Sequence, residues 1–257
     1  MSEAPNYMGA LYKFFKSIFE KSRIILEPNN SFVPLESIPH YYYLNAHKSI
    51  DIATSVEIFS DLSREIISEG RTLLSYDRLY TLFQAVMQLP QNPIAVEVGA
   101  YKGGSSKFIA TLLRSQKGGG KLYSCDTFTG HATVDRRYDG KHVLKNYFGD
   151  VTADEVKRYL EPLNNVTVLV GDIAKTYTHI EEPFINLIHL DVDVYTPIKF
   201  VLDALWPRIA PHGFILVDDY GFTTCKGAKK AVDDFMARTR DCIKFHFLTG
   251  QCILIKA

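Results

Sequence analysis

Short apolar segments alternate with helical patterns from about residue 75 to residue 257, and this alternation limits the possible fold more than any other feature. Short, continuously apolar runs bounded by turn residues are typical of strands buried on both faces of a parallel sheet. Such runs predict strands at 94–98, 121–125, 166–170, 185–190 and 214–217. Two further runs, 243–248 and 252–255, flank Thr249-Gly250-Gln251 and predict a hairpin. We therefore predict an α/β fold, a doubly wound and mostly parallel seven-stranded sheet with a C-terminal antiparallel hairpin.

Capping residues predict where the intervening helices begin. Ser75 is a candidate N-cap, and Thr152 with Glu155 three residues later forms a predicted capping box. Thr196 followed by Pro197 predicts the N-cap and first turn of another helix. Segment 127–150 is polar and too long for a simple connection, so we predict a functional loop there.

Residues 1–74 lack the alternation. An amphipathic pattern covers 8–26, while 27–76 combines scattered prolines with the run Tyr41-Tyr42-Tyr43. Helix packing explains this amphipathic pattern better than membrane attachment, because its basic residues are few. We interpret 1–74 as an N-terminal helical lid or oligomerisation segment, which predicts a homo-oligomer, and 75–257 as the α/β domain.

Composition argues against several classes of protein. Lys and Arg total 29 and so do Asp and Glu, so no net charge attracts nucleic acid or an anionic membrane. No segment has the length and apolarity of a membrane span or a signal peptide. The 4 cysteines lack the paired spacing of a zinc ribbon or a disulfide framework. We expect reduced cysteines and a cytoplasmic location.

Acidic residues follow four of the five predicted parallel strands. These residues are Asp126, Asp172, Asp191, Asp218 and Asp219. The carboxyl ends of parallel strands share one edge of a sheet, where ligands bind in such folds. A strand-end Asp often only caps the next helix. Several at one edge favour instead a site for hydroxyl groups, amides or a cation.

The segment 97–106 (EVGAYKGGSS) is a glycine-rich turn from strand to helix. Its glycines allow close approach of a ligand, and the helix N-terminus offers free N–H groups. Glycines at 99, 103 and 104 do not fit the dinucleotide pattern G-x-G-x-x-G. Asp126 is placed to accept both ribose hydroxyls of an adenosine, and Asp172 to accept from the adenine amino group. This set suits adenosine without a pyrophosphate.

Four motifs follow one another along the chain. They are Glu97-x-Gly99-x-x-x-Gly103-Gly104-Ser105, Ser124-Cys125-Asp126-Thr127-Phe128-x-Gly130, Leu190-Asp191-x-Asp193-x-Tyr195, and Pro211-x-Gly213-Phe214-x-x-x-Asp218-Asp219-Tyr220-Gly221. Together they resemble the macrocin O-methyltransferase family. The resemblance covers residues 75–240. It implies a Rossmann-like class I fold and S-adenosylmethionine-dependent methylation of a sugar hydroxyl on a glycosylated natural product, as in antibiotic biosynthesis. The expected donor-binding residues are Glu97, Gly99, Gly103, Ser105, Asp126 and Asp172.

An alcohol must become more anionic before it attacks a methyl sulfonium. Mg²⁺ held by Asp191, Asp218 and Asp219 would polarise the reacting hydroxyl, and an all-oxygen site favours Mg²⁺ over zinc. Asp193 is the expected general base, a division of labour that the resemblance also implies. Val194 stands where related catechol-type enzymes carry a lysine base, which favours an aliphatic diol as acceptor.

Other residues and functions are weaker candidates. His189 fits a buried core histidine better than a metal ligand, because it lies inside a predicted strand. His131, Arg136, Arg137 and His142 are possible substrate contacts in the long loop. The alternative functions are a nicotinamide-dependent oxidoreductase, which the glycine spacing disfavours, and a non-catalytic adenosine-binding scaffold.

Overall fold

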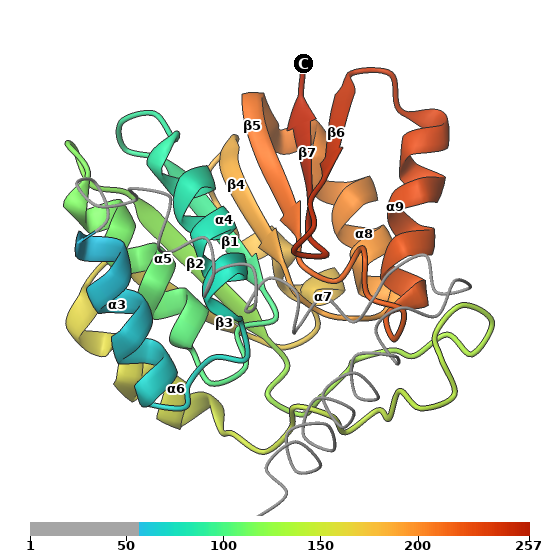
Figure 1. Ribbon diagram of the computed structural model, residues 1–257, viewed down its shortest axis with the longest axis horizontal. Helices are drawn as coiled ribbons and strands as arrows, with labels where there is room; N and C mark the ends of the chain where they lie inside the picture. The colour runs from blue at the N-terminus through green and yellow to red at the C-terminus, as the bar shows by residue number, and fades with distance from the viewer. Residues whose placement is uncertain (1–56) are drawn as a thin grey trace, which may run out of the picture.

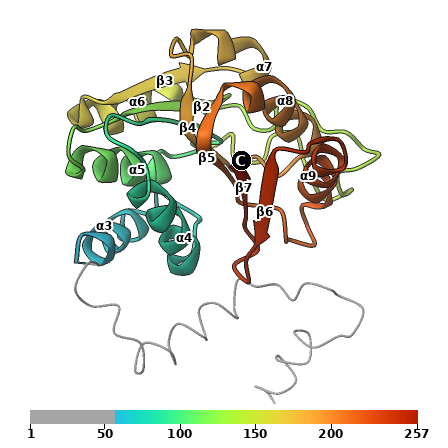
Figure 2. The same ribbon diagram turned by 90° about the horizontal axis from the view of Figure 1, so that it is seen from above.

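The computed structural model describes residues 57–257, which form one sheet with helices on both faces (Figures 1 and 2). The strands are β1 (Ile94–Val98), β2 (Lys121–Asp126), β3 (Val166–Val170), β4 (Ile185–Leu190), β5 (Ile209–Val217), β6 (Cys242–His246) and β7 (Cys252–Lys256). They lie in the order β3-β2-β1-β4-β5-β7-β6. Strands β1 to β5 are parallel, and β7 is antiparallel to both β5 and β6. The predicted fold class is confirmed.

Two groups of helices cover the sheet, as Figure 2 shows from above. The α-helices are α3 (Glu57–Ser68), α4 (Tyr76–Met87), α5 (Gly104–Ser115), α6 (Ala153–Leu160), α7 (Ile173–Thr176), α8 (Tyr195–Leu205) and α9 (Lys226–Arg238). Short 3₁₀ turns follow three of them, at Glu161–Leu163, Tyr177–His179 and Trp206–Arg208. Helices α3 to α6 pack on one face of the sheet, and α7 to α9 pack on the other.

Alternating strand residues belong to two separate hydrophobic clusters. Ala95 and Leu187 face α3 to α6, whereas their neighbours Val96 and Ile188 face α7 to α9. All four are fully buried. Because successive side chains of a strand point to opposite faces, a strand covered on both sides must be apolar throughout. This requirement explains why the parallel strands were recognisable as continuous apolar runs.

Two predicted element starts are wrong. Strand β5 begins at Ile209 rather than at 214, and its pairing with β4 shifts register between Ile185 and Leu187. Helix α8 begins at Tyr195 after Val194, so Thr196 is not its N-cap. The Asp139 carboxylate accepts a hydrogen bond from the Tyr195 backbone N–H at 2.9 Å, so the cap comes from the long loop.

The other two predicted caps have different outcomes. Thr152 and Glu155 form the capping box of α6, which is confirmed. Ser75 is the N-cap residue of α4, but its hydroxyl makes no capping hydrogen bond and instead accepts from Arg78 Nε at 3.3 Å.

Helix α3 packs into the α/β domain although it precedes residue 75. Phe59 is only 1% exposed and contacts Phe108 of α5 edge to face, with ring centroids 6.2 Å apart. Lys107 of α5 pairs with Glu65 and Glu69 at 2.7 and 3.0 Å. Helix α3 therefore packs in the same hydrophobic cluster as α4 and α5. The rest of the predicted lid and oligomerisation segment, including 8–26 and Tyr41-Tyr42-Tyr43, lies outside the described residues.

The strand order reverses between β1 and β4: β2 and β3 lie on the far side of β1, and β5, β7 and β6 lie on the far side of β4. In folds of this kind, ligands bind beyond the carboxyl ends of the strands at that point. Segment 127–150 contains no helix or strand and runs beside this edge. Between residues 57 and 257, no helix is long and apolar enough to cross a membrane.

Candidate functional site

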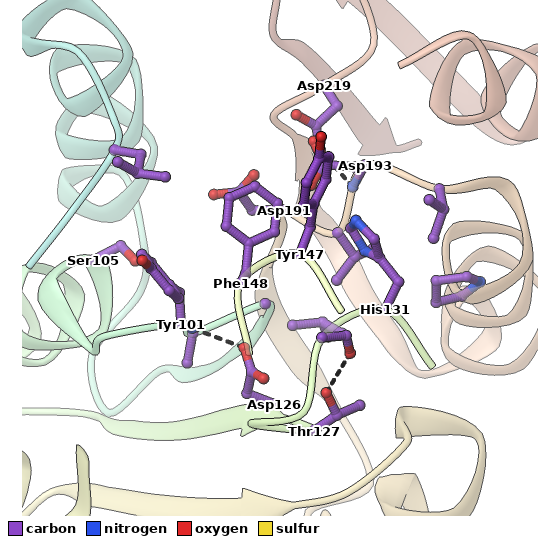
Figure 3. Close-up of a pocket in the computed structure, with 18 of the residues that line it drawn as sticks. Tyr101, Ser105, Asp126, Thr127, His131, Tyr147, Phe148, Asp191, Asp193 and Asp219 are labelled. Atoms are coloured by element: carbon purple, nitrogen blue, oxygen red, sulfur yellow. Dashed lines mark hydrogen bonds between the residues drawn. The ribbon is translucent and has the colours of Figure 1, made fainter. Parts of the chain in front are cut away.

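A cavity of about 510 Å³ opens at the carboxyl ends of the parallel strands. The predicted site residues that line it are Gly99, Ser105, Asp126, Asp172, Asp191, Asp193 and Asp219. Figure 3 shows Asp191, Asp193 and Asp219 gathered at one end and Asp126 with Thr127 at the other. The cavity thus has two acidic ends, one formed after β2 and β3 and the other after β4 and β5.

Gly99 allows the turn after β1 to approach the end of β4. Its φ is +100°, and an added Cβ would lie 1.7 Å from the backbone oxygen of Asp191. No side chain fits in that space, and few other residues adopt this positive φ, so both the close contact and the backbone conformation require glycine. This close approach brings the glycine-rich turn directly beside the acidic residues that follow β4.

Asp126 is held in place by backbone donors at the end of β2. Its two carboxylate oxygens accept from the N–H groups of Tyr101 and Phe128, at 2.7 and 2.6 Å. Burial raises the pKa of Asp126, although these two hydrogen bonds oppose the rise. Each carboxylate oxygen keeps a further lone pair for a ligand in the cavity.

The remaining predicted donor-binding residues lie in different surroundings. Ser105 lines the cavity at the start of α5, and Asp172 lines it while capping α7 through the Ala174 N–H at 3.0 Å. Gly103 instead faces α6, where an added Cβ would lie 3.0 Å from Val156. Glu97 is fully buried in β1 behind the cavity wall.

Asp191, Asp218 and Asp219 come together at the other end of the cavity. They offer carboxylate oxygens that all lie within 4.8 Å of one another. Burial and the neighbouring carboxylates raise the pKa values of Asp191 and Asp219 well above their usual range. This concentration of negative charge is what a divalent cation with oxygen ligands would offset.

Asp218 lies behind the other two and is fully buried. One of its oxygens accepts from Gln251 Nε2 at 2.7 Å, and the other pairs with the Arg78 guanidinium. Burial acts to raise the pKa of Asp218, but Arg78 and His189 hold it below its usual value. Asp218 therefore remains a carboxylate in a buried position.

Glu97 and His189 form a buried pair beside Asp218. His189 Nδ1 and Glu97 Oε1 are 3.0 Å apart, and Ser106 donates to the other Glu97 oxygen. Burial opposes protonation of His189, but the Asp218 and Glu97 carboxylates raise its pKa to about 10. His189 thus lies in the core, as predicted, and Glu97 contacts it there rather than lining the cavity.

Asp193 adopts a left-handed backbone conformation, with φ of +60°. Its backbone N–H donates to Asp219 at 2.9 Å, and the Cys225 thiol donates to its side chain at 3.2 Å. Burial and the nearby Asp219 and Asp193 carboxylates raise the pKa of Cys225, which keeps the thiol protonated as a donor. These contacts fix the Asp193 carboxylate at the cavity wall.

Aromatic side chains from the long loop line the middle of the cavity (Figure 3). The Phe148 ring contacts Tyr101 and His131 edge to face, with centroids 5.5 and 5.7 Å apart. Burial lowers the pKa of His131, although Asp193 and Asp139 act to raise it. The wall between the two acidic ends is therefore largely apolar and neutral.

Three site residues were not predicted from the sequence: Arg78, Cys225 and Gln251. Arg78 and Asp218 are 140 residues apart in the chain, and Gln251 and Asp218 are 33 apart. No local motif contains these pairs. An arginine in the first turn of a helix and a glutamine in a hairpin turn give no signal until the topology is known.

Known proteins are similar to this chain over the region that builds the site. A family profile described as "Methyltransferase domain" matches residues 96–220. A Streptomyces olivaceus protein, 8-demethyl-8-(2,3-dimethoxy-alpha-L-rhamnosyl)-tetracenomycin-C 4'-O-methyltransferase, is 29% identical over 69% of this chain and 72% of its own length. Demethyldecarbamoylnovobiocin O-methyltransferase from Streptomyces niveus is 25% identical over 70% and 75%. This chain is an O-methyltransferase.

The predicted resemblance to antibiotic-pathway O-methyltransferases is confirmed by these relatives, and S-adenosylmethionine is the methyl donor. A solved structure of the O-methyltransferase NovP shares the fold of this methyltransferase, with a TM-score of 0.58 and 22% identity. It covers 72% of this chain and 81% of its own. The matches do not support the alternative of a nicotinamide-dependent oxidoreductase.

Proposed function

We propose that this O-methyltransferase transfers a methyl group to a sugar hydroxyl of a glycosylated natural product, using Mg²⁺ at Asp191, Asp218 and Asp219 and Asp193 as general base. The observation that carries the proposal is one cavity with Asp126 and Asp172 at one end and Asp191, Asp193 and Asp219 at the other, which is called the acidic end below. The tetracenomycin relative, whose name specifies a rhamnosyl group, supports a sugar acceptor for this enzyme as well.

The donor end of the cavity suits S-adenosylmethionine. The Asp126 carboxylate, fixed by two backbone N–H groups, has lone pairs left for the ribose hydroxyls. Gly99 lets the turn after β1 pack directly on the end of β4, and it lines this part of the cavity. Ser105 and Asp172 also line this part of the cavity. We do not propose that Glu97 contacts the donor, because its carboxylate is buried against His189.

The acidic end fits Mg²⁺ by the chemistry of its donors. Asp191, Asp218 and Asp219 bring oxygen ligands within 4.8 Å of one another, and such hard ligands suit Mg²⁺. The two oxygens of Asp218 already accept hydrogen bonds, but each oxygen can accept a second interaction. When bound there, the ion supplies a Lewis acid that lowers the pKa of the acceptor hydroxyl.

In this proposal, Asp193 removes the proton from the acceptor hydroxyl. As the hydroxyl oxygen forms its bond to the methyl carbon, the bond from carbon to the sulfonium breaks and the proton passes to the Asp193 carboxylate. Positioning contributes as well, because an in-line displacement needs the oxygen, carbon and sulfur aligned. The apolar wall at Phe148 and Tyr147 would keep water from the reacting groups.

The proposal is tested by following methyl transfer from labelled S-adenosylmethionine to a panel of glycosides, with Mg²⁺ or with EDTA. We expect transfer that EDTA abolishes and Mg²⁺ restores. In Asp193→Asn, kcat should fall by about 10² to 10⁴-fold while the affinity for the donor is retained. Methyl transfer that persists in EDTA would refute the role of Mg²⁺. Unchanged turnover of Asp193→Asn would refute the role of Asp193 as general base.

The same assay tests the non-catalytic scaffold. Such a protein would bind the donor without transfer to any glycoside under any metal. Lys199→Ala is a suitable control variant, because Lys199 pairs with Asp203 on the exposed side of α8. Its turnover should match that of the wild type.

A further inference from the structure

Arg78 joins three parts of the molecule at the acidic end of the cavity. It lies in the first turn of α4, and its side chain is only 13% exposed. The guanidinium pairs with Asp218, donates to the Leu73 carbonyl at 2.6 Å, and donates to the Ser75 hydroxyl at 3.3 Å. The planar arrangement of its N–H groups permits several directed contacts at once, which a lysine cannot reproduce.

Gln251 completes the surroundings of Asp218 from the hairpin before β7. Its side-chain amide donates to Asp218 at 2.7 Å and to the backbone carbonyl of Arg78 at 3.3 Å. Arg78, Asp218 and Gln251 therefore form a closed set of contacts, which we call the Asp218 network. This network fixes Asp218 from two sides without any contribution from Asp191 or Asp219.

Two opposed consequences follow for a cation at the acidic end. The network orients the Asp218 carboxylate in advance, which favours binding of the cation because the side chain then loses less conformational freedom. The guanidinium charge lies on the same carboxylate, so it repels any second cation held there. Repulsion between a monovalent and a divalent cation at such short range in a poorly solvated site outweighs the orientation of one side chain.

We propose that Arg78 is a built-in counter-cation that positions Asp218, ties segment 71–75 to the acidic end, and weakens the binding of Mg²⁺. The inference rests on the proposed metal site at Asp191, Asp218 and Asp219. Segment 71–75 also lines the cavity, so Arg78 links the binding of the ion to the shape of the cavity wall.

The test measures Mg²⁺ binding by calorimetry and thermal unfolding on the full chain, without donor or acceptor. In Arg78→Gln without Mg²⁺, we expect the Tm to fall by about 5 °C or more, because a buried carboxylate loses its partner. We expect its affinity for Mg²⁺ to rise by about tenfold or more, with a larger Mg²⁺-induced rise in Tm than in the wild type. Arg64→Gln is the matched control, because Arg64 pairs with Asp61 on the exposed surface of α3.

Arg78→Lys separates charge from hydrogen bonding. It keeps the positive charge, so Mg²⁺ affinity should stay within about threefold of wild type. It cannot reproduce the contacts to Leu73 and Ser75. Segment 71–75 should therefore be held less firmly, and trypsin cleavage after Arg71 should become faster. If Arg78→Gln does not fold, this variant decides, since a tenfold gain in affinity with the charge retained would contradict the inference.

The outcomes also distinguish this inference from the proposed function. If neither the wild type nor Arg78→Gln responds to Mg²⁺, the metal site itself is wrong and the inference fails with it. If the wild type binds Mg²⁺ and Arg78→Gln binds it no more tightly, the role of Arg78 is wrong and the metal site stands. Equal Tm values without Mg²⁺ would show that Arg78 does not stabilise Asp218.

Discussion

Asp193, the proposed general base, has a left-handed backbone conformation that few non-glycine residues adopt. A non-glycine residue at φ of +60° is held there only by its surroundings, and here those are Asp219 at the backbone and Cys225 at the side chain. A base held by both contacts remains aimed at one point in the cavity. The thiol is therefore a candidate positioning group for turnover.

We predict that Cys225→Ala lowers kcat by about 3- to 10-fold, which corresponds to one net hydrogen bond. The KM for the donor should stay unchanged, because Asp126 lies at the other end of the cavity. Cys225→Ser supplies a hydroxyl donor in the same place and should restore most of the activity.

Steady-state kinetics with saturating Mg²⁺ measure the effect. Cys242→Ala serves as the control, because Cys242 lies in β6 and does not line the cavity. Wild-type turnover in Cys225→Ala would exclude a role for the thiol. Loss of turnover in the serine variant as well would indicate a packing effect instead.

At the scale of elements, the long loop is fixed to the helices by Asp139. Its carboxylate accepts from the backbone N–H groups of Tyr195, at the start of α8, and Asp135, in the loop itself. It also lies against Gly227 in the first turn of α9, where an added Cβ would be 1.8 Å from Asp139 Oδ1. One buried carboxylate therefore holds the loop against the starts of two helices.

We predict that Asp139→Ala lowers the free energy of unfolding by about 1–2 kcal/mol, as for the loss of a helix cap. The KM for the acceptor should also rise, because Tyr147 and Phe148 of the same loop line the cavity. Asp139→Asn keeps one acceptor oxygen and should lose less stability. Urea unfolding and acceptor kinetics are the measurements.

Asp154→Ala is the comparison for that experiment, since Asp154 is an exposed residue in the first turn of α6. An Asp139→Ala variant that unfolds at the same urea concentration as Asp154→Ala would show that the loop is not fixed by this carboxylate.

Elements were predictable from sequence where the signal is local. The strands at 94–98, 166–170 and 185–190 match the structure because continuous apolar runs report burial on both faces. The start of α8 was not predictable, because its capping group comes from a residue 56 positions earlier. Strand β5 was predicted too short because Pro211, His212 and Gly213 interrupt its apolar pattern.

Residues of the candidate site were likewise predictable only where a local pattern contains them. Asp126, Asp191 and Asp219 were identified because each follows a recognisable strand, and all three line the cavity. Glu97 lies inside β1 rather than beyond its end, and it is in register with His189 of the neighbouring β4, so the two side chains contact each other in the core. Arg78 and Gln251 reach the acidic end only through the packing of α4 and the hairpin on the sheet.

At the scale of the whole molecule, α3 belongs to the domain core. Phe59 contacts Tyr76, Tyr80 and Phe83 of α4 as well as Phe108 of α5. We predict that Phe59→Ala lowers the free energy of unfolding by about 3–5 kcal/mol, as expected for an aromatic core residue. A domain that began at residue 75 would instead be insensitive to this change.

Equilibrium unfolding in urea, followed by circular dichroism, measures the difference. Leu144→Ala is the matched control, because Leu144 is 46% exposed. This substitution should lower the free energy of unfolding by less than about 1 kcal/mol. Equal midpoints for the two variants would place α3 outside the cooperative unit.

The placement of β7 between β5 and β6 has a consequence for biosynthesis. The ribosome makes β5 first and β6 second, yet among the strands of residues 57–257 β6 pairs only with β7, which is made last of the three. Until β7 emerges, the nascent sheet exposes the apolar edge of β5, a surface prone to wrong pairing. Chaperone demand during translation should therefore be concentrated in the interval between the synthesis of β5 and that of β7.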